Sequence, residues 1–426
     1  MFTSTLTLML AVCDLSGSFA EKTGWEKPAE AFVAEHQADG FRFADAKKNI
    51  ANCLRRGGCT WEGLEVWEAR VYYREGAAVR VEMSLYNRGD DRSGTPKTAA
   101  DLKTLLDQIA ERAEPGGKIG SNPEKKKLPS GGYQFQRRFT KGANDVELVW
   151  GVDSVKAKDL SADYVRVTLT PKGTGPKVSR STVGVVSKTK AKANVTKNDA
   201  GDVWIDNVPM VDQGQKGYCA AATVARIMGY YGYDFLDQHQ IASWAKSDAD
   251  RGTNERMLDA IAGVLHDRYK LVYREVPGSV NDFFKLVEDY NKAAKRLKQP
   301  EVSLKPMPGT RVIDAGAVWR QFQPDVLREA RTKNQTRNNL FFDNIRKSID
   351  AGTPVIWSVM LGLVPENPPL PQAFGGHMRL IVGYNAKERT ILYTDSWGAG
   401  HERKTMKLED AILITTGLRT ISWTLN

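Results

Sequence analysis

One cysteine near the middle of the chain follows a loop punctuated by glycines. Residues 213–223 read Gln-Gly-Gln-Lys-Gly-Tyr-Cys-Ala-Ala-Ala-Thr, and the alanines after Cys219 favour a helix. This pattern puts the thiol of Cys219 at a helix N-terminus, where backbone N–H groups and the positive end of the helix dipole stabilise a thiolate. Because the thiolate is the nucleophilic form of cysteine, Cys219 is the candidate nucleophile.

A thiolate that cleaves an acyl group also needs an imidazole to protonate the leaving group, and a third group to orient that imidazole. His377, one of five histidines, opens a strand-like run over 377–384. After a turn, a second strand-like run over 390–393 leads to Asp395. Paired strands of this kind would bring Asp395 next to His377, so the chain contains a Cys, His and Asp in the order that such a site requires.

Together these motifs resemble those of the papain-like cysteine peptidases. The resemblance rests on Q-G-x-x-G-x-C, on a glycine-preceded His that opens a strand ending in Val-Gly-Tyr, and on D-S-W-G. The Asp in place of the more usual Asn resembles the branch that includes the bacteriocin-leader-processing peptidases. The likeness extends over roughly 203–421, about half of the chain.

The resemblance implies hydrolysis of a protein or peptide substrate through a thioester, with no cofactor and no metal. It implies that Cys219 is the nucleophile, that His377 is the general base and acid, and that Asp395 orients His377. It further implies that Gln213 is the side-chain donor of the oxyanion hole, and that Trp397 shields the His–Asp hydrogen bond from water.

Other interpretations of these residues remain open. A single cysteine is often a small buried hydrophobe, and a histidine that opens a strand is often structural. An ionised Asp395 also suits a transglutaminase-like amidase or another thioester acyltransferase. A third alternative is a binding protein that keeps the fold without turnover. The ordered conjunction of motifs favours the peptidase.

The 426 residues, 41% of them hydrophobic and 26% charged, predict a soluble protein of two or three domains. We expect the α+β class, with a papain-like two-lobed domain over 203–426, in which a helical lobe carries the nucleophile and an antiparallel β lobe carries the base. A smaller α+β domain over 21–170 precedes it. Residues 67–85 alternate as a hairpin with a turn at Glu75-Gly76, but this domain shows no catalytic constellation and is either a pro-region or a binding module.

Residues 1–20 are nearly free of charge and end in Ser-Phe-Ala, which resembles a signal peptide without its usual positive start. They predict export to the cell envelope or the exterior, the alternative being an ordinary buried N-terminal segment. No other stretch approaches the roughly 20 apolar residues of a membrane helix, so we expect no stable membrane insertion.

Cys53 and Cys59 are separated by a segment with two glycines that lets the chain turn back, so a small disulfide loop is sterically plausible. Two free thiols are the alternative. A zinc site is disfavoured because no second pair of Cys or His lies nearby in the sequence.

The formal net charge of +10 raises the question of nucleic-acid binding. Much of the excess lies in a segment over 171–202 that shows no periodicity and no aromatic side chain for base stacking, so we expect a basic linker and no nucleic acid. Exposed linkers are also sites of proteolysis. The first domain is therefore a candidate intramolecular inhibitor that is removed by cleavage in this linker.

Overall fold

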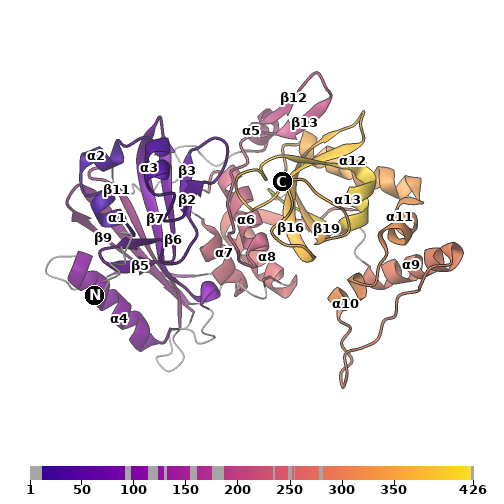
Figure 1. The fold of residues 1–426 in the computed structure, drawn as a ribbon, viewed down its shortest axis with the longest axis horizontal. Coiled ribbons are helices and arrows are strands. Elements are labelled where there is room, and N and C mark those ends of the chain that lie inside the picture. The colour runs from indigo at the N-terminus through magenta and orange to yellow at the C-terminus, as the bar shows by residue number, and fades with distance from the viewer. Residues whose placement is uncertain are drawn as a thin grey trace, which may run out of the picture. The chain divides into compact units, whose positions relative to one another are not determined.

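The computed structural model describes residues 12–91, 97–113, 123–128, 132–153, 161–174, 187–233, 236–247, 252–253, 255–277 and 282–423. The chain divides into two compact units, Met1–Ser179 and Arg180–Asn426 (Figure 1). Within the described part, no helix combines the length and the apolar character that a membrane crossing needs.

The first unit is built on an antiparallel sheet in the order β2-β3-β6-β7-β11-β10-β9-β8, beside a small sheet in the order β1-β4-β5. The predicted hairpin is β6 and β7, and positive φ angles at Glu75 and Gly76 match the tight turn. The strands of the large sheet are β2 (Phe41–Phe43), β3 (Ile50–Cys53), β6 (Glu68–Arg74), β7 (Ala77–Asn87), β8 (Glu124–Lys127), β9 (Tyr133–Lys141), β10 (Asn144–Val152) and β11 (Ala162–Pro171). The remaining elements are β1 (Cys13–Asp14), β4 (Cys59–Trp61), β5 (Leu64–Val66), α1 (Leu15–Ser18), α2 (Lys22–Trp25), α3 (Ala29–Glu35), η1 (Arg88–Asp90) and α4 (Ala99–Ala113).

The N-terminal segment is part of the core of the first unit. Leu15 and Phe19 are fully buried, and the Phe19 ring packs against Trp25 and Phe32. Cleavage after Ala20, as the predicted signal peptide requires, would remove both side chains from this core. The packing gives the signal peptide no support and fits the alternative of a buried segment, while residues 1–11 lie outside the described residues.

The second unit contains an antiparallel sheet in the order β12-β13-β16-β15-β19-β14, with β17 paired to β16 and β18 paired to β17. Helices lie mainly in the first part of the unit, before the central strands (Figure 1). Its helices are α5 (Lys188–Ala193), α6 (Cys219–Tyr230), α7 (Gln238–Ala245), α8 (Glu255–Tyr269), α9 (Phe283–Leu297), α10 (Ala315–Trp319), α11 (Pro324–Thr332), α12 (Gln335–Asp350) and α13 (Leu408–Ile414). Its strands are β12 (Val195–Lys197), β13 (Asp202–Ile205), β14 (Leu271–Glu275), β15 (Val355–Leu361), β16 (Gly375–Asn385), β17 (Thr390–Thr394), β18 (Lys404–Lys407) and β19 (Thr415–Trp423).

The α+β class is confirmed, and three local predictions need correction. Part of the expected linker over 171–202 folds into the second unit, because β12 pairs with β13 and β13 pairs with β16. The apolar run over 411–423 predicts a single strand, but β19 begins only at Thr415, since α13 precedes it with Glu409 and Asp410 in its first turn. The front half of this unit also contributes the strand β14, which pairs with β19.

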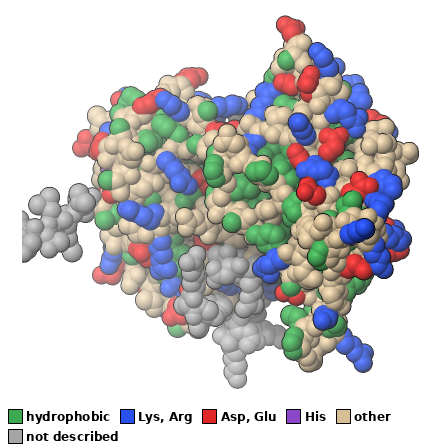
Figure 2. All heavy atoms as spheres, turned by 45° about the vertical axis from the view of Figure 1, so that its right-hand side comes forward, with side chains coloured by type: hydrophobic (Ala, Val, Ile, Leu, Met, Phe, Trp, Pro, Cys, Tyr) green, Lys and Arg blue, Asp and Glu red, His purple; other side chains and the backbone are tan. Residues whose placement is uncertain are grey.

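The surface charge is mixed rather than segregated on the face that Figure 2 shows. Lys and Arg side chains lie there among Asp and Glu side chains, and hydrophobic side chains are scattered between them. Mixed charge of this kind is typical of a solvated surface and gives no single-signed field along which a polyanion would be drawn.

We predict that Phe19→Ala lowers the free energy of unfolding by about 3–5 kcal/mol, because it leaves a cavity among Trp25, Phe32 and Phe19's other neighbours. Urea unfolding of the full chain measures this loss. Val79→Ala, at a position 37% exposed in the same unit, is the control and changes the free energy by less than about 0.5 kcal/mol. Equal stabilities of Phe19→Ala and the control would show that residues 13–20 are dispensable to the core.

Candidate active site

Cys219 is the first residue of α6, as the alanine-rich sequence predicts. Gly214 adopts a φ of +66°, a left-handed conformation that glycine reaches without strain, so the preceding loop can turn into the helix. The N-cap residue Tyr218 makes no side-chain capping hydrogen bond, and so the first N–H groups of α6 are not satisfied by a cap. The Cys219 sulfur therefore lies at a helix N-terminus that favours a negative charge.

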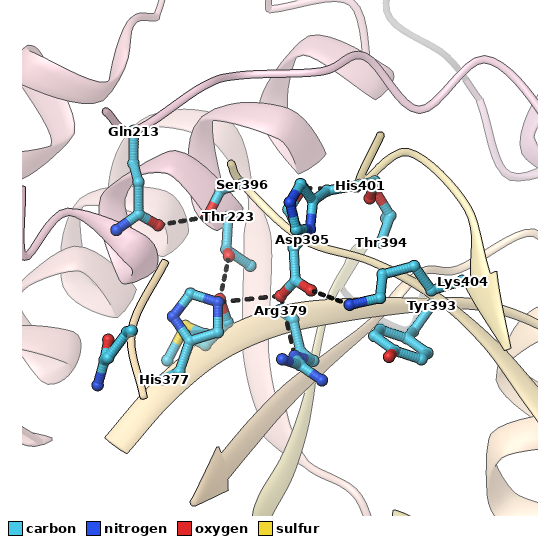
Figure 3. Close-up of polar contacts among 12 residues, drawn as sticks. Gln213, Thr223, His377, Arg379, Tyr393, Thr394, Asp395, Ser396, His401 and Lys404 are labelled. Carbon is cyan, nitrogen blue, oxygen red and sulfur yellow. Dashed lines mark hydrogen bonds and ion pairs between the residues drawn. The ribbon is translucent and has the colours of Figure 1, made fainter. Parts of the chain in front are cut away.

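His377 and Asp395 are brought together by the antiparallel pairing of β16 and β17. Leu380 pairs with Thr394, so the end of β17 lies beside the start of β16. His377 Nε2 is 3.0 Å from Asp395 Oδ1, and both side chains are fully buried (Figure 3). The prediction that the two strands place these side chains next to each other is thus confirmed.

The edge of the His377 ring away from Asp395 is open to Cys219. Nδ1 has no geometrically defined hydrogen-bond partner within the described residues, and the Cys219 thiol interacts electrostatically with this imidazole. Burial raises the pKa of the thiol, but the hydrogen bond and charge of His377, with the backbone N–H groups of Met378 and Ala220, bring it below its ordinary value. Burial lowers the pKa of the imidazole, but its hydrogen bonds to Asp395 and Cys219 raise it above its ordinary value.

These opposite shifts favour a thiolate at Cys219 and an imidazolium at His377. Each charged group stabilises the other beside the buried His377 ring, where Coulombic attraction is stronger than in solvent, although Cys219 is itself partly exposed. The pair is therefore prepared for nucleophilic attack and for protonation of a leaving group without any further proton transfer.

Asp395 is kept ionised by two cations although its side chain is fully buried. Arg379 Nε lies 2.9 Å from Asp395 Oδ1, and Lys404 Nζ lies 3.8 Å from Oδ2. Burial raises the pKa of this carboxyl, but the charges of Arg379, His377 and Lys404 outweigh the burial and hold the pKa at about 2. Asp395 is thus a charged partner of His377 throughout the neutral range.

Glu366 balances the second positive charge and was not predicted. Its carboxylate accepts from Arg379 at 3.1 and 3.2 Å and from Lys404 at 3.0 Å, and the Tyr393 hydroxyl also donates to it. Two carboxylates and two cations then leave the cluster without net charge, which reduces the large cost of burying each ion alone. Glu366 belongs to a proline-rich loop over 365–371, whose sequence predicts either a border of the cleft or a simple connection between two strands.

Gln213 lies beside the site and is held by three hydrogen bonds. Its backbone N–H donates to Ser396 O at 2.7 Å, its side-chain oxygen accepts from Ser396 Oγ at 2.5 Å, and its Nε2 donates to Lys216 O at 2.7 Å. An amide nitrogen carries two protons, so one remains for a substrate oxyanion. The position is compatible with the oxyanion-hole role that the resemblance implies.

Trp397 lies flat against His377. The ring centroids are 4.1 Å apart and the planes are tilted by 5°, and Trp397 is itself buried. The indole therefore covers one face of the imidazole and limits access of water to the bond between His377 and Asp395. This placement agrees with the shielding that the resemblance implies for Trp397.

Arg226 joins α6, the helix that begins at Cys219, to the strand end that carries Asp395. Its guanidinium donates to Pro209 O at 2.8 Å, to Asp395 O at 2.9 Å and to Thr394 Oγ1 at 2.7 Å. A single arginine within an otherwise apolar helix is the feature of the sequence that could have indicated this link. Its hydrogen-bond partners lie up to 169 residues away in the chain, so the sequence alone did not reveal them.

Cys53 and Cys59 belong to the first unit and take no part in this site. Both are free thiols in the structure, and the side chain of Cys59 is hydrogen-bonded to Cys53. The predicted disulfide is therefore not formed, although the two side chains lie close enough to interact.

The C-terminal part of this site lies in a region that is similar to a known protein family. Residues 306–416 match the model of the Peptidase_C39 like family. The C-terminal region is thus similar to that family. The match confirms the resemblance predicted from the motifs; it includes His377 and Asp395 and begins after Cys219.

Among solved structures, the chain matches xylellain, a cysteine protease from Xylella fastidiosa. The identity is 15% and the TM-score is 0.28, over 55% of this chain and 89% of xylellain. A comparison with curated proteins found no match.

We predict that iodoacetamide alkylates Cys219 at a pH below the value of about 8.5 at which an ordinary cysteine is half ionised. The lowered pKa of the thiol leaves the thiolate present from that lower pH upward. In His377→Gln the partner is lost and the midpoint moves to higher pH. Mass spectrometry of the Cys219 peptide measures the alkylation rate against pH in wild type and in His377→Gln. Identical midpoint pH values in the two proteins would contradict the interaction of Cys219 with His377.

We also predict that Arg379→Met lowers the free energy of unfolding by about 3–5 kcal/mol, because it leaves buried carboxylates without their main cation. The matched control is Arg389→Met, whose partly exposed guanidinium lies 3.8 Å from Glu409 and contributes at most about 1 kcal/mol. Urea unfolding compares them. A cost for Arg379→Met no larger than for the control would mean that the charge cluster is not coupled to folding.

Proposed function

We propose that this chain is a cysteine peptidase in which Cys219, His377 and Asp395 form the catalytic triad, on a papain-like two-lobed domain. One observation carries the proposal: the buried His377 imidazole is hydrogen-bonded to Asp395 through Nε2 and interacts with the Cys219 thiol, whose pKa it lowers. The family match over 306–416 supports a peptide as the substrate.

In the proposed first step, the Cys219 thiolate attacks the carbonyl carbon of a peptide bond. The carbonyl oxygen becomes an oxyanion, which the Cys219 backbone N–H and the free proton of Gln213 Nε2 stabilise. His377 then gives its proton to the departing amine nitrogen, the C–N bond breaks, and a thioester to Cys219 remains.

In the second step, neutral His377 takes a proton from water while the oxygen of that water attacks the thioester carbon. The bond between carbon and sulfur breaks, the acid product leaves, and the thiolate and imidazolium are restored. Asp395 stays ionised in both steps, because its pKa of about 2 lies far below neutrality, and so it stabilises the imidazolium without taking its proton.

The alternative is transfer of the acyl group to an amine, as in a transglutaminase-like enzyme. The ionised Asp395 favours it equally, since an amine nucleophile in the second step needs the same base. Export of the protein and inhibition by the first unit stay predictions, to be tested separately.

We predict that Cys219→Ala abolishes cleavage of a peptide library, whereas Gln213→Ala lowers the rate by about 10²–10³-fold because one oxyanion donor is lost. His266→Ala, at an exposed histidine away from the triad, is the control and keeps full activity. Cleavage is followed by mass spectrometry with and without an added primary amine.

The products decide between the candidate functions. Free carboxyl termini support the peptidase, and amide products that form only with the amine support the acyltransferase. Equal cleavage by wild type and Cys219→Ala would end the proposal of a thiol enzyme.

A further inference from the structure

Three of the four cysteines of the chain come together in the first unit, far from the proposed nucleophile in sequence. Cys13 and Cys59 are paired residues of the parallel strands β1 and β4, and Cys53 ends β3 with its thiol hydrogen-bonded to Cys59. All three are buried, with exposed fractions of 2% for Cys13 and 0% for the other two. Neighbouring buried thiols are softer ligands than any other protein group.

A histidine and a carboxylate face the same cluster from the end of α3. One donor atom from each of Cys13, His36 and Asp39 lies within 4.8 Å of the other two. The His36 ring is 9% exposed, and its Nδ1 is 3.2 Å from Asp39 Oδ2. Its Nε2 is buried and makes no hydrogen bond within the described residues; the nearest acidic oxygen, Glu35 Oε1, is 3.6 Å away.

We propose that the first unit binds a divalent ion of the zinc class through Cys13, His36 and Asp39, with one thiol of the Cys53 and Cys59 pair as the fourth ligand. Thiolate, imidazole and carboxylate are the groups that bind zinc in proteins, and four such ligands complete its tetrahedral shell. A Zn–S length of about 2.3 Å separates tetrahedral ligands by roughly 3.8 Å, so the spacing of at most 4.8 Å among Cys13, His36 and Asp39 needs only a small contraction.

A metal ion explains this arrangement better than a disulfide does. Three thiols cannot all pair with one another, and a bond between Cys53 and Cys59 would leave Cys13 buried beside Asp39. A divalent cation stabilises several anionic ligands at once, so it would suit a buried site that gathers thiols and a carboxylate.

The sequence disfavoured zinc because no second pair of Cys or His lies near Cys53 and Cys59, and the proposed ligands are spread over 47 positions, from Cys13 to Cys59. Only the fold brings β1 alongside β4 and the end of α3 alongside both. The site would also tie the N-terminal segment to the rest of the unit. Cys13 can serve as a ligand only if residues 13–20 remain part of the chain.

The test uses the full chain, reduced, stripped with a chelator and then given Zn²⁺ or Co²⁺. We expect about one Zn²⁺ per chain by elemental mass spectrometry, and a near-ultraviolet charge-transfer band with Co²⁺ that reports thiolate ligation. Cys219→Ala, which removes the fourth cysteine of the chain, is the matched control and binds both ions as wild type does.

Cys13→Ser and His36→Gln should each weaken Zn²⁺ binding by more than the roughly 10–100-fold cost of losing an outer-shell partner. Wild-type protein that binds neither ion after reduction overturns the proposal without recourse to any variant. So does unchanged affinity in both variants, or loss of the Co²⁺ band only in Cys219→Ala.

Discussion

The buried ion pair between Arg379 and Asp395 is the interaction on which the candidate site depends. A carboxylate that is fully out of water would ordinarily take up a proton, and a protonated Asp395 could not stabilise a positive His377. The guanidinium 2.9 Å away, with Lys404 behind it, keeps the charge on Asp395. The negative charge of Glu366 balances the second of the two positive charges, those of Arg379 and Lys404. The cluster can therefore be buried without net charge.

The fold serves this cluster by fixing distances between elements that are remote in sequence. The sheet fixes His377 relative to Asp395 through the register of β16 and β17. The helix α6 is fixed to the same strand end by Arg226, whose guanidinium reaches the backbone of Asp395. A thiol at the start of that helix is therefore held beside the imidazole by buried hydrogen bonds, not by a mobile loop.

The positions of the proposed catalytic residues were predictable from the sequence, whereas the charges that support them were not. Cys219, His377 and Asp395 stand at helix and strand boundaries marked by glycine, alanine and alternating apolar residues, which are local signals. Arg379 and Glu366 carry no such signal, because a charged residue usually indicates a solvated position and only the tertiary fold reveals that these two are buried together.

The N-terminal segment is another case in which the sequence pattern alone could not choose between two structures. An apolar run that ends in small residues fits both a signal peptide and a core segment, and the choice depends on contacts with distant strands. Leu15 and Phe19 make such contacts in the folded unit. Likewise Cys13 has a neighbour in Cys59 only once β1 and β4 pair.

The proposed mechanism requires that the Cys219 sulfur, activated by His377, form a bond to the acyl carbon of its substrate. The most direct measurement is rapid acid quenching during turnover of a peptide, followed by mass spectrometry of the intact protein and of its fragments. We expect a transient mass increase equal to the acyl part of the substrate, located on Cys219. Turnover without any adduct, or an adduct on a different residue, would contradict it.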